Sequence, residues 1–365
     1  MTDRSAPRRQ KLRQALKGKG LGAELITNPT NVRYLTGFTG EDSYLLLTRD
    51  NTILISDGRF TTQIEQECPD LEVFIRPTSV GMKQAVAQIL KKSRVTEVGF
   101  ESHYLTVDAF EAFRSGCEGV EFVPLPPLVE ELREIKDAEE IAAIREAIRQ
   151  AEKGFGTLKA NLLPQLTERE VAFDLEHAMR RFGAKGASFE TIVAVGARAA
   201  LPHARPTETR IADDEFVLVD WGADGPTGYK SDLTRVLVTG KRTSKFEKVY
   251  EIVRSAQVKA IEAIRPGISG REVDQVARSV IEEAGYGKYF THSLGHGIGL
   301  DIHEGPRLSP AANTELKVGM VVTAEPGIYI PKWGGVRIED DVLVTKDGYE
   351  VLTSVPKDLE SCFLE

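Results

Sequence analysis

The pattern of apolar positions in the first 130 residues predicts short strands alternating with helices. The segments AELITNPTNVRYLTGF and DSYLLLTRDNTILISDGRF carry apolar runs bounded by Asn, Pro, Gly or Asp, which is typical of buried strands. TEVGFES predicts another short strand. In RFTTQIEQE and VGMKQAVAQILKKS apolar residues recur every three or four positions, which predicts helices. This part of the chain is therefore expected to form an α/β domain.

A change in pattern marks the end of that domain. Three prolines in FVPLPPLVEELREIKDAEE precede a charged segment, as is typical of a boundary. A long helix is then predicted from Ala138, because Ile141, Ile144, Ile148 and Phe155 form one apolar stripe. We place the boundary near residue 130, which gives an N-terminal domain over 1–130 and a C-terminal domain over 131–365.

The C-terminal domain contains a faint internal repeat. LTEREVAFDLEHAMRRFGA and ISGREVDQVARSVIEEAGYG share a capping box, a helical stripe and a glycine stop. EFVLVD (215–220) then corresponds to MVVTAE (320–325), and SDLTRVLVT (231–239) corresponds to IEDDVLVTK (338–346). Two halves with the same order of helix and hairpin predict packing about a pseudo-twofold axis.

Each half ends its first strand in an acid and opens its second strand with another. These acids are Asp220 and Asp232 in the first half, and Glu325 and Glu339 in the second. A hairpin places each pair side by side, and the pseudo-twofold axis brings both pairs to one centre. Four buried carboxylates raise one another's pKa and need a compensating cation. They are enough to hold two divalent metals, with His296 of the stretch GHGIGLDIHE as an imidazole ligand.

Composition and charge narrow the class of protein. The chain is 41% hydrophobic and 28% charged, as in soluble globular proteins. Its net charge of −8 argues against a nucleic-acid partner, because phosphate contacts need clustered Lys and Arg. No apolar run approaches the ~20 residues that span a bilayer, and the N-terminus lacks a secretory pattern, so no membrane partner is expected. Cys68, Cys117 and Cys362 are odd in number and far apart, which suits reduced thiols in a cytoplasm.

The five candidate ligands lie in motifs that resemble those of the pita-bread metallopeptidases, which include methionine aminopeptidase, aminopeptidase P and prolidase. The motifs are DWG at Asp220, SDLTR at Asp232, GHGIG at His296, EPGIY at Glu325 and RIED at Glu339. The resemblance is strong over 130–365. NVRYLTGFTG (31–40) and SDGRF (56–60) extend it to the N-terminal domain of the proline-specific branch. It implies an α/β N-terminal domain followed by an α+β pita-bread domain with pseudo-twofold symmetry.

Two positions depart from the family pattern. Asp220 and Asp232 are one residue farther apart than is common in the family. The additional residue falls in the turn ADGPTGYK, where a hairpin tip tolerates insertions. Asp341 is also unusual, and we interpret it as a strand-packing residue.

The resemblance implies roles for the metal ligands. Asp220 is expected to bind one metal, Asp232 and Glu339 to bridge two metals, and His296 and Glu325 to complete the second site. Mn²⁺ is the first choice, with Co²⁺, Zn²⁺ or Fe²⁺ as alternatives. Glu325 is also expected to carry a proton from the attacking water to the leaving nitrogen.

The resemblance also implies roles around the metals. His303 is expected to steady the carbonyl oxygen and the oxyanion, and His203 to contact the substrate near its N-terminal side. His292 is expected to line a proline pocket, and Arg307 to meet a substrate carboxylate. Arg337 is expected to orient Glu339 from behind the ligands. Taken alone, each histidine is also compatible with a structural role, and Arg307 with a surface ion pair.

These features favour a metallopeptidase that cleaves before proline. The first hypothesis is a short aminopeptidase P that releases the N-terminal residue from Xaa-Pro peptides. The alternative is a prolidase, which takes Xaa-Pro dipeptides. Methionine aminopeptidase usually lacks such an N-terminal domain. A metal-free creatinase-like hydrolase or a non-catalytic peptide-binding module predicts loss of the acidic ligands, which are all present. The resemblance further implies a homodimer in which the N-terminal domain helps to shape the substrate entrance of the partner.

Overall fold

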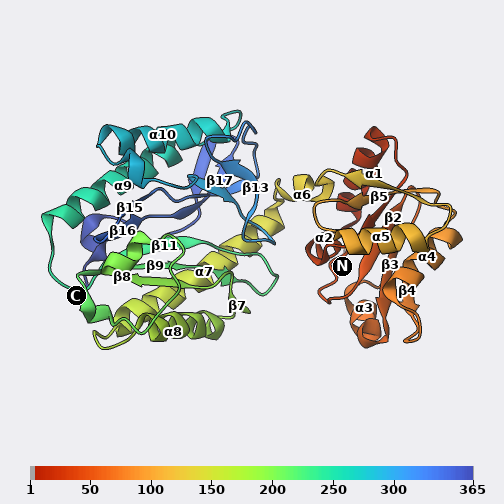
Figure 1. Ribbon diagram of the computed structural model, residues 1–365, viewed down its shortest axis with the longest axis horizontal. Coiled ribbons are helices and arrows are strands. Elements are labelled where there is room, and N and C mark those ends of the chain that lie inside the picture. Colours follow the sequence, from red (N-terminus) through yellow and green to blue (C-terminus); the bar gives the residue numbers. More distant parts are fainter. Residues whose placement is uncertain (1–4, 365) are drawn as a thin grey trace. The chain divides into compact units, whose positions relative to one another are not determined.

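A computed structural model describes residues 5–364 of the protein, and the chain divides into two compact units. The first ends at Arg133 and the second begins at Glu134. Figure 1 shows the elements of both units. Among the described residues, no helix combines the length and apolarity needed to cross a bilayer.

The first unit is built on a six-stranded mixed sheet in the order β4-β3-β2-β1-β5-β6. Strand β1 runs antiparallel to β2 and parallel to β5. Ala23 and Leu25 of β1 face a core formed with α4 and α5. The strands are β1 (Ala23–Ile26), β2 (Tyr44–Thr48), β3 (Thr52–Asp57), β4 (Glu72–Arg76), β5 (Glu97–Glu101) and β6 (Glu121–Leu125). The helices are α1 (Ser5–Gly18), α2 (Pro29–Thr36), α3 (Thr61–Glu67), α4 (Met82–Lys92), α5 (Val107–Gly116) and α6 (Leu128–Arg133).

One segment expected to be extended is helical. The apolar run in NPTNVRYLTGF forms α2 instead of a strand, so that prediction was wrong. The Asn28 side chain caps the helix by accepting from the Thr30 N–H, and Pro29 occupies its first turn. Gly37, at φ 80°, ends it in the left-handed region. The cap at the start and the glycine at the end therefore make this segment a helix, although its apolar run is typical of a strand.

The second unit consists of two similar halves. Helices α7 (Ala138–Asn161) and α8 (Glu168–Arg181) belong to the first half, and α9 (Ser244–Ala263) and α10 (Gly270–Glu283) to the second. The predicted capping boxes are present, with Thr167 before α8 and Ser269 before α10. Within this unit, Figure 1 shows α7 and α8 on one side of the strands and α9 and α10 on the other.

The strands of the second unit form two main sheets between these helix pairs. The first sheet has the order β11-β9-β8, and the second the order β13-β12-β14-β17-β18. The first comprises β8 (Ile192–Val195), β9 (Phe216–Trp221) and β11 (Leu233–Val238). The second comprises β12 (Gly295–Gly297), β13 (Glu304–Leu308), β14 (Val321–Ala324), β17 (Asp340–Thr345) and β18 (Gly348–Val351). Two smaller pairs are β7 (Gly186–Ala187) with β10 (Ala223–Asp224), and β15 (Gly327–Ile330) with β16 (Gly334–Arg337). The paired halves, the predicted pita-bread arrangement, are thus observed.

Strand alternation decides which way the first acid points. Val217, Val219 and Trp221 pack against α7 and α8, whereas Phe216 and Leu218 pack in the core shared with α9 and α10. Because side chains alternate across a strand, Asp220 lies on the second of these faces. Trp221 fixes the strand end, since its ring stacks on Phe155 with centroids 4.2 Å apart and its Nε1–H donates to the Ala151 carbonyl.

Candidate metal centre and substrate cavity

The two hairpins bring their acidic ends together. Strand β9 pairs with β11 so that Asp220 lies opposite Thr234, and β14 pairs with β17 so that Ala324 lies opposite Asp340. A β-bridge joins Thr234 to Glu339, with the Glu339 N–H donating to the Thr234 carbonyl at 3.2 Å. The halves therefore meet at the acids.

The five predicted ligands all line one cavity. Asp232, His296 and Glu339 each offer a ligand atom, and these atoms lie within 4.8 Å of one another. His296 Nε2 is 3.4 Å from Glu325 Oε1 and 3.7 Å from Asp232 Oδ2. Asp220 completes the set on the cavity wall.

The buried carboxylates of this cluster favour the binding of cations that compensate their negative charge. Burial raises the pKa of Asp232 and of Glu339 well above the ordinary range, and neighbouring carboxylates raise both further. Burial also raises the pKa of Glu325 to about 8. Asp220 Oδ1 and Glu339 Oε1 are buried without a hydrogen-bond partner among the described residues. Hard carboxylate oxygens that lack donors, beside one imidazole, fit divalent metal ions.

The His296 ring is oriented to offer a lone pair to this cluster. Its Nδ1 lies 3.0 Å from the Gly297 carbonyl oxygen, which only accepts, so Nδ1 carries the hydrogen. Nε2, which faces Asp232 and Glu325, is then available to bind a metal ion. Burial lowers the pKa of His296 to about 3, so the ring is neutral as metal binding requires.

The glycines of GHGIG have a packing role. A Cβ on Gly295 would lie 2.1 Å from the Thr323 carbonyl oxygen, and one on Gly297 would lie 2.0 Å from the Gly305 carbonyl oxygen. Only glycine allows this approach of backbones, which lets β12 carry His296 between β13 and β14.

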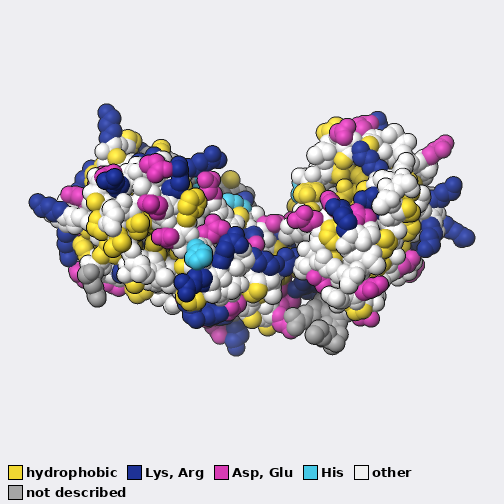
Figure 2. Space-filling model, turned by 90° about the horizontal axis from the view of Figure 1, so that it is seen from below, with side chains coloured by type: hydrophobic (Ala, Val, Ile, Leu, Met, Phe, Trp, Pro, Cys, Tyr) yellow, Lys and Arg dark blue, Asp and Glu magenta, His cyan; other side chains and the backbone are white. Residues whose placement is uncertain are grey.

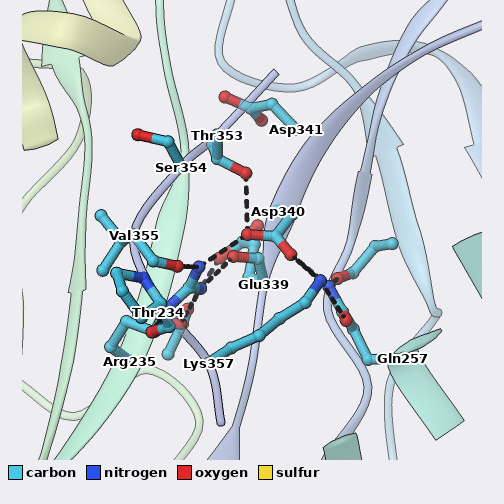
Figure 3. Close-up of polar contacts among 12 residues, drawn as sticks. Thr234, Arg235, Gln257, Glu339, Asp340, Asp341, Thr353, Ser354, Val355 and Lys357 are labelled. Atoms are coloured by element: carbon cyan, nitrogen blue, oxygen red, sulfur yellow. Dashed lines mark hydrogen bonds and ion pairs between the residues drawn. The ribbon is translucent and has the colours of Figure 1, made fainter. Parts of the chain in front are cut away.

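Three consecutive carboxyl groups begin at Glu339 and have different surroundings. Asp340 is surrounded by Arg235, Thr353, Gln257 and Lys357 (Figure 3), with Arg235 at 2.7 Å. Burial raises the pKa of Asp340, but Arg235 and Lys357 outweigh it and leave that pKa below its ordinary value. Asp340 is thus a structural anchor for the strand that carries Glu339.

Asp341 does more than pack within its strand. Its Oδ2 accepts a hydrogen bond from the Asp232 N–H at 3.1 Å, so it supports the backbone of a predicted ligand. Its Oδ1 is buried without a partner among the described residues. The interpretation of Asp341 as a packing residue therefore missed this contact across the two halves.

The cavity next to the cluster has a volume of about 450 Å³, which is in the range of small-ligand sites. The predicted substrate residues His203, His292, His303, Arg307 and Arg337 all line it. The His303 ring centroid is 4.4 Å from that of His296. Partial burial, followed by the Arg307 charge, lowers the pKa of His303.

Arg337 is linked to the ligands differently from what we expected. It forms an ion pair with Asp220, and its Nε donates to Thr234 Oγ1 at 3.1 Å. Thr234 Oγ1 in turn donates to Glu339 Oε2 at 2.7 Å. Arg337 thus contacts Asp220 directly and is linked to Glu339 by hydrogen bonds through Thr234.

Tyr329 joins Arg337 to His292. The His292 Nδ1–H donates to the Ser293 carbonyl at 2.7 Å, which leaves Nε2 to accept from the Tyr329 hydroxyl at 2.8 Å. The same hydroxyl accepts from Arg337 at 2.7 Å. Burial lowers the pKa of His292 to about 4, which keeps its ring neutral for this role. His292 is thus linked through Tyr329 and Arg337 to the predicted ligand Asp220, and it also lines the cavity.

Sequence reasoning did not assign Tyr329 or Thr234, although both stand in motifs that it used. Thr234 lies two residues after Asp232, and Tyr329 ends EPGIY. Strand alternation was an available signal for Thr234, because residues two apart face the same side. Glu190 and Arg205, which also line the cavity, were not singled out.

Comparison with known proteins agrees with this architecture. Residues 142–346 match the model of metallopeptidase family M24, and residues 8–135 match the creatinase/prolidase N-terminal domain. The chain is 38% identical to a Xaa-Pro dipeptidase of Pyrococcus furiosus, over 96% of this chain and 99% of the relative.

Solved structures give the same picture. A Xaa-Pro dipeptidase from Bacillus anthracis aligns with a TM-score of 0.93 at 39% identity, covering 97% of this chain and 99% of that one. An X-Pro aminopeptidase from Thermotoga maritima aligns with a TM-score of 0.87 at 34% identity, covering 93% and 97%. The fold and the cluster define a pita-bread metallopeptidase. The chain belongs to metallopeptidase family M24, whose members are hydrolases that use divalent metal ions.

Proposed function

We propose that the protein is a Xaa-Pro dipeptidase. The observation that carries the proposal is the cavity, which is lined both by the carboxylate and imidazole cluster and by Arg307, a partner for a free carboxylate. The full-length relatives named Xaa-Pro dipeptidases support this reading. They support the prolidase alternative better than the aminopeptidase P hypothesis that the sequence motifs favoured.

Asp220, Asp232, His296, Glu325 and Glu339 would hold two divalent metal ions, with Mn²⁺ as the first candidate. The close ligand atoms and the unpartnered carboxylate oxygens support this assignment. Such ions supply Lewis-acid chemistry, by polarising a carbonyl group and acidifying water. Arg337, Tyr329, Thr234 and Asp341 hold the ligands in place through the hydrogen bonds described above.

The chain's own groups complete the reaction. Glu325 accepts the proton of the attacking water at a carboxylate oxygen and returns it to the proline nitrogen as the C–N bond breaks. His303, beside His296 at the cavity, donates a hydrogen bond to the oxyanion. His203 holds the N-terminal residue of the substrate, and Arg307 pairs with the proline carboxylate.

Side-by-side hydrolysis of Ala-Pro and Ala-Pro-Ala by the Mn²⁺-loaded protein tests this proposal. A dipeptidase cleaves Ala-Pro efficiently and Ala-Pro-Ala poorly. Preferred cleavage of the tripeptide would establish an aminopeptidase P, consistent with the similarity to the X-Pro aminopeptidase of Thermotoga maritima. Failure to cleave either peptide in the presence of Mn²⁺, Co²⁺ or Zn²⁺ would reject both readings.

A further inference from the structure

Two charged residues at the cavity have no part in the proposed reaction. Glu190 and Arg205 both line the cavity, and within residues 5–364 each forms an ion pair only with the other, at 3.5 Å between Glu190 Oε2 and Arg205 Nε. Their side chains are 67% and 83% exposed. A long ion pair between exposed groups contributes little to stability, so it is easily exchanged for another partner.

The backbone that carries Arg205 is, by contrast, firmly held. Glu168 has no exposed surface, and its carboxylate accepts from the Val195 N–H, Arg198 Nε and the Thr207 N–H at 2.8–2.9 Å. Arg198 also donates to the Arg205 carbonyl at 2.6 Å. A buried charged network therefore fixes the segment from Arg205 to Thr207 beside the cavity. Arg205 combines a fixed main chain with a guanidinium group free to change partner.

We propose that Arg205 is a specificity residue that binds the free carboxylate of a Xaa-Pro dipeptide and exchanges Glu190 for it. This inference rests on the proposed dipeptidase function. Arg307, which lies opposite His296 in the β12–β13 register, and Arg205 both line the cavity, so Arg205 supplies a second cation there. A longer peptide places a neutral amide where the dipeptide carries its carboxylate, and it gains nothing from Arg205. A guanidinium group matches a carboxylate in a bidentate geometry.

Kinetics on a charged and an uncharged substrate test the inference. kcat and KM are measured for Ala-Pro and for Ala-Pro-amide, with wild type, Arg205→Gln, Arg205→Lys and Glu190→Gln. Arg169→Gln is the matched control, because Arg169 forms an exposed ion pair with Glu208 and does not line the cavity. Arg205→Gln is expected to raise KM for Ala-Pro about 10-fold, with little change in kcat or in the amide kinetics. Arg205→Lys is expected to give an intermediate KM, and Glu190→Gln a lower one.

Salt provides a second readout that a structural role would not change. The wild-type KM for Ala-Pro is expected to rise with NaCl concentration more steeply than that of Arg205→Gln, because salt screens exposed charges. Equal effects of Arg205→Gln on both substrates, or no effect, would overturn the inference while the proposed function stands. A wild-type enzyme that cleaves neither substrate would overturn the proposed function and this inference with it.

Discussion

Glu325 combines two properties that a proton-transfer group needs. Its carboxylate lies 3.4 Å from the candidate ligand His296, and Thr323 donates to the same oxygen at 3.2 Å. In the protein without metal, burial raises its pKa to about 8, so this carboxylate holds a proton more tightly than an exposed glutamate does. Position and proton affinity therefore coincide in one side chain.

Replacing Glu325 by Gln keeps its shape and removes this proton affinity. Glu325→Gln is expected to lower kcat on Ala-Pro by about 10²–10⁴-fold, and to weaken metal binding because a ligand charge is lost. Steady-state kinetics and metal titration by calorimetry provide the measurements. Glu350→Gln, an exposed acid paired with Arg145, is the control and should behave as wild type. Normal turnover in Glu325→Gln would refute the assignment.

The hydroxyl oxygen of Tyr329 forms the hydrogen bonds that connect this side chain to Arg337 and His292. Tyr329→Phe keeps the ring but leaves Arg337 and His292 each without one hydrogen-bond partner. Because Arg337 in turn holds Asp220, metal affinity is expected to fall about 10–100-fold, and the free energy of unfolding by about 1–3 kcal/mol. Calorimetric metal titration and urea unfolding measure the two effects. An unchanged metal affinity would show that the link from Tyr329 to Asp220 carries no coupling.

At the residue scale, the sequence predicted the members of the site better than their contacts. The four acids were predicted because strand ends in an internal repeat place charge where burial is costly, and His296 was predicted from the stretch GHGIGLDIHE. The partners of Arg337 and the role of Asp341 were missed, because a hydrogen bond between the two halves depends on side-chain orientation. The pattern of residues along one strand does not determine how a side chain is oriented toward the other half.

At the scale of elements, β12 shows how close packing of backbones positions a ligand. Gly295 faces the Thr323 carbonyl, and Thr323 Oγ1 accepts from the His296 N–H at 3.0 Å. The same threonine also donates to Glu325. Strand β12 must therefore lie tight against β14 for His296 and Glu325 to meet.

A methyl group at Gly295 should force these strands apart. Gly295→Ala is expected to lower the free energy of unfolding by about 1–3 kcal/mol and to weaken metal binding, because His296 moves with its strand. Gly18→Ala is the control, since a Cβ there meets nothing within 4 Å. Urea unfolding and metal titration of both variants give the comparison. A Gly295→Ala protein with wild-type stability and affinity would contradict the packing argument.

Helices and hairpins with caps were predictable, whereas one short apolar run was not. The capping boxes at Thr167 and Ser269 and the strands β9, β11, β14 and β17 were read correctly. The run that forms α2 has the composition of a strand, and its cap at Asn28 and stop at Gly37 decided its structure. A short apolar run is compatible with a helix or a strand until the capping residues at its two ends are considered.

At the scale of the whole molecule, charge is distributed differently at the surface and in the site. Figure 2 shows acidic and basic side chains interspersed over the visible face of the molecule. The predicted ligands instead gather four carboxylates around one cavity, and Arg337 forms an ion pair with one of them, Asp220. The fold therefore concentrates unfavourable charge at the junction of its two halves, where the proposed cations would relieve it.

This concentration predicts how stability depends on pH when a chelator keeps metal away. The raised pKa values of Asp232, Glu325 and Glu339 mean that the folded state binds protons that the unfolded state releases. These carboxyl groups contribute to the free energy of unfolding fully at low pH. The contribution is lost as the pH rises through the pKa of each group in the folded state, which is about 8 for Glu325. Buried His292 and His296 act in the opposite direction, because their lowered pKa values make stability rise with pH up to about 6.5.

Between pH 6.5 and 8.5 the carboxylates therefore decide the slope. In EDTA, the free energy of unfolding is expected to fall across this window, by about 1.4 kcal/mol per pH unit for each proton released. With Mn²⁺, the fall should disappear or reverse, because metal binds the ionised carboxylates and its affinity grows with pH. Urea unfolding at half-unit pH steps in EDTA and in Mn²⁺ measures both slopes. Glu325→Gln in EDTA should show a shallower fall than wild type, since one titrating group is gone. An EDTA-treated wild type that grows more stable from pH 6.5 to 8.5 would contradict the strained, cation-requiring cluster on which the proposed function depends.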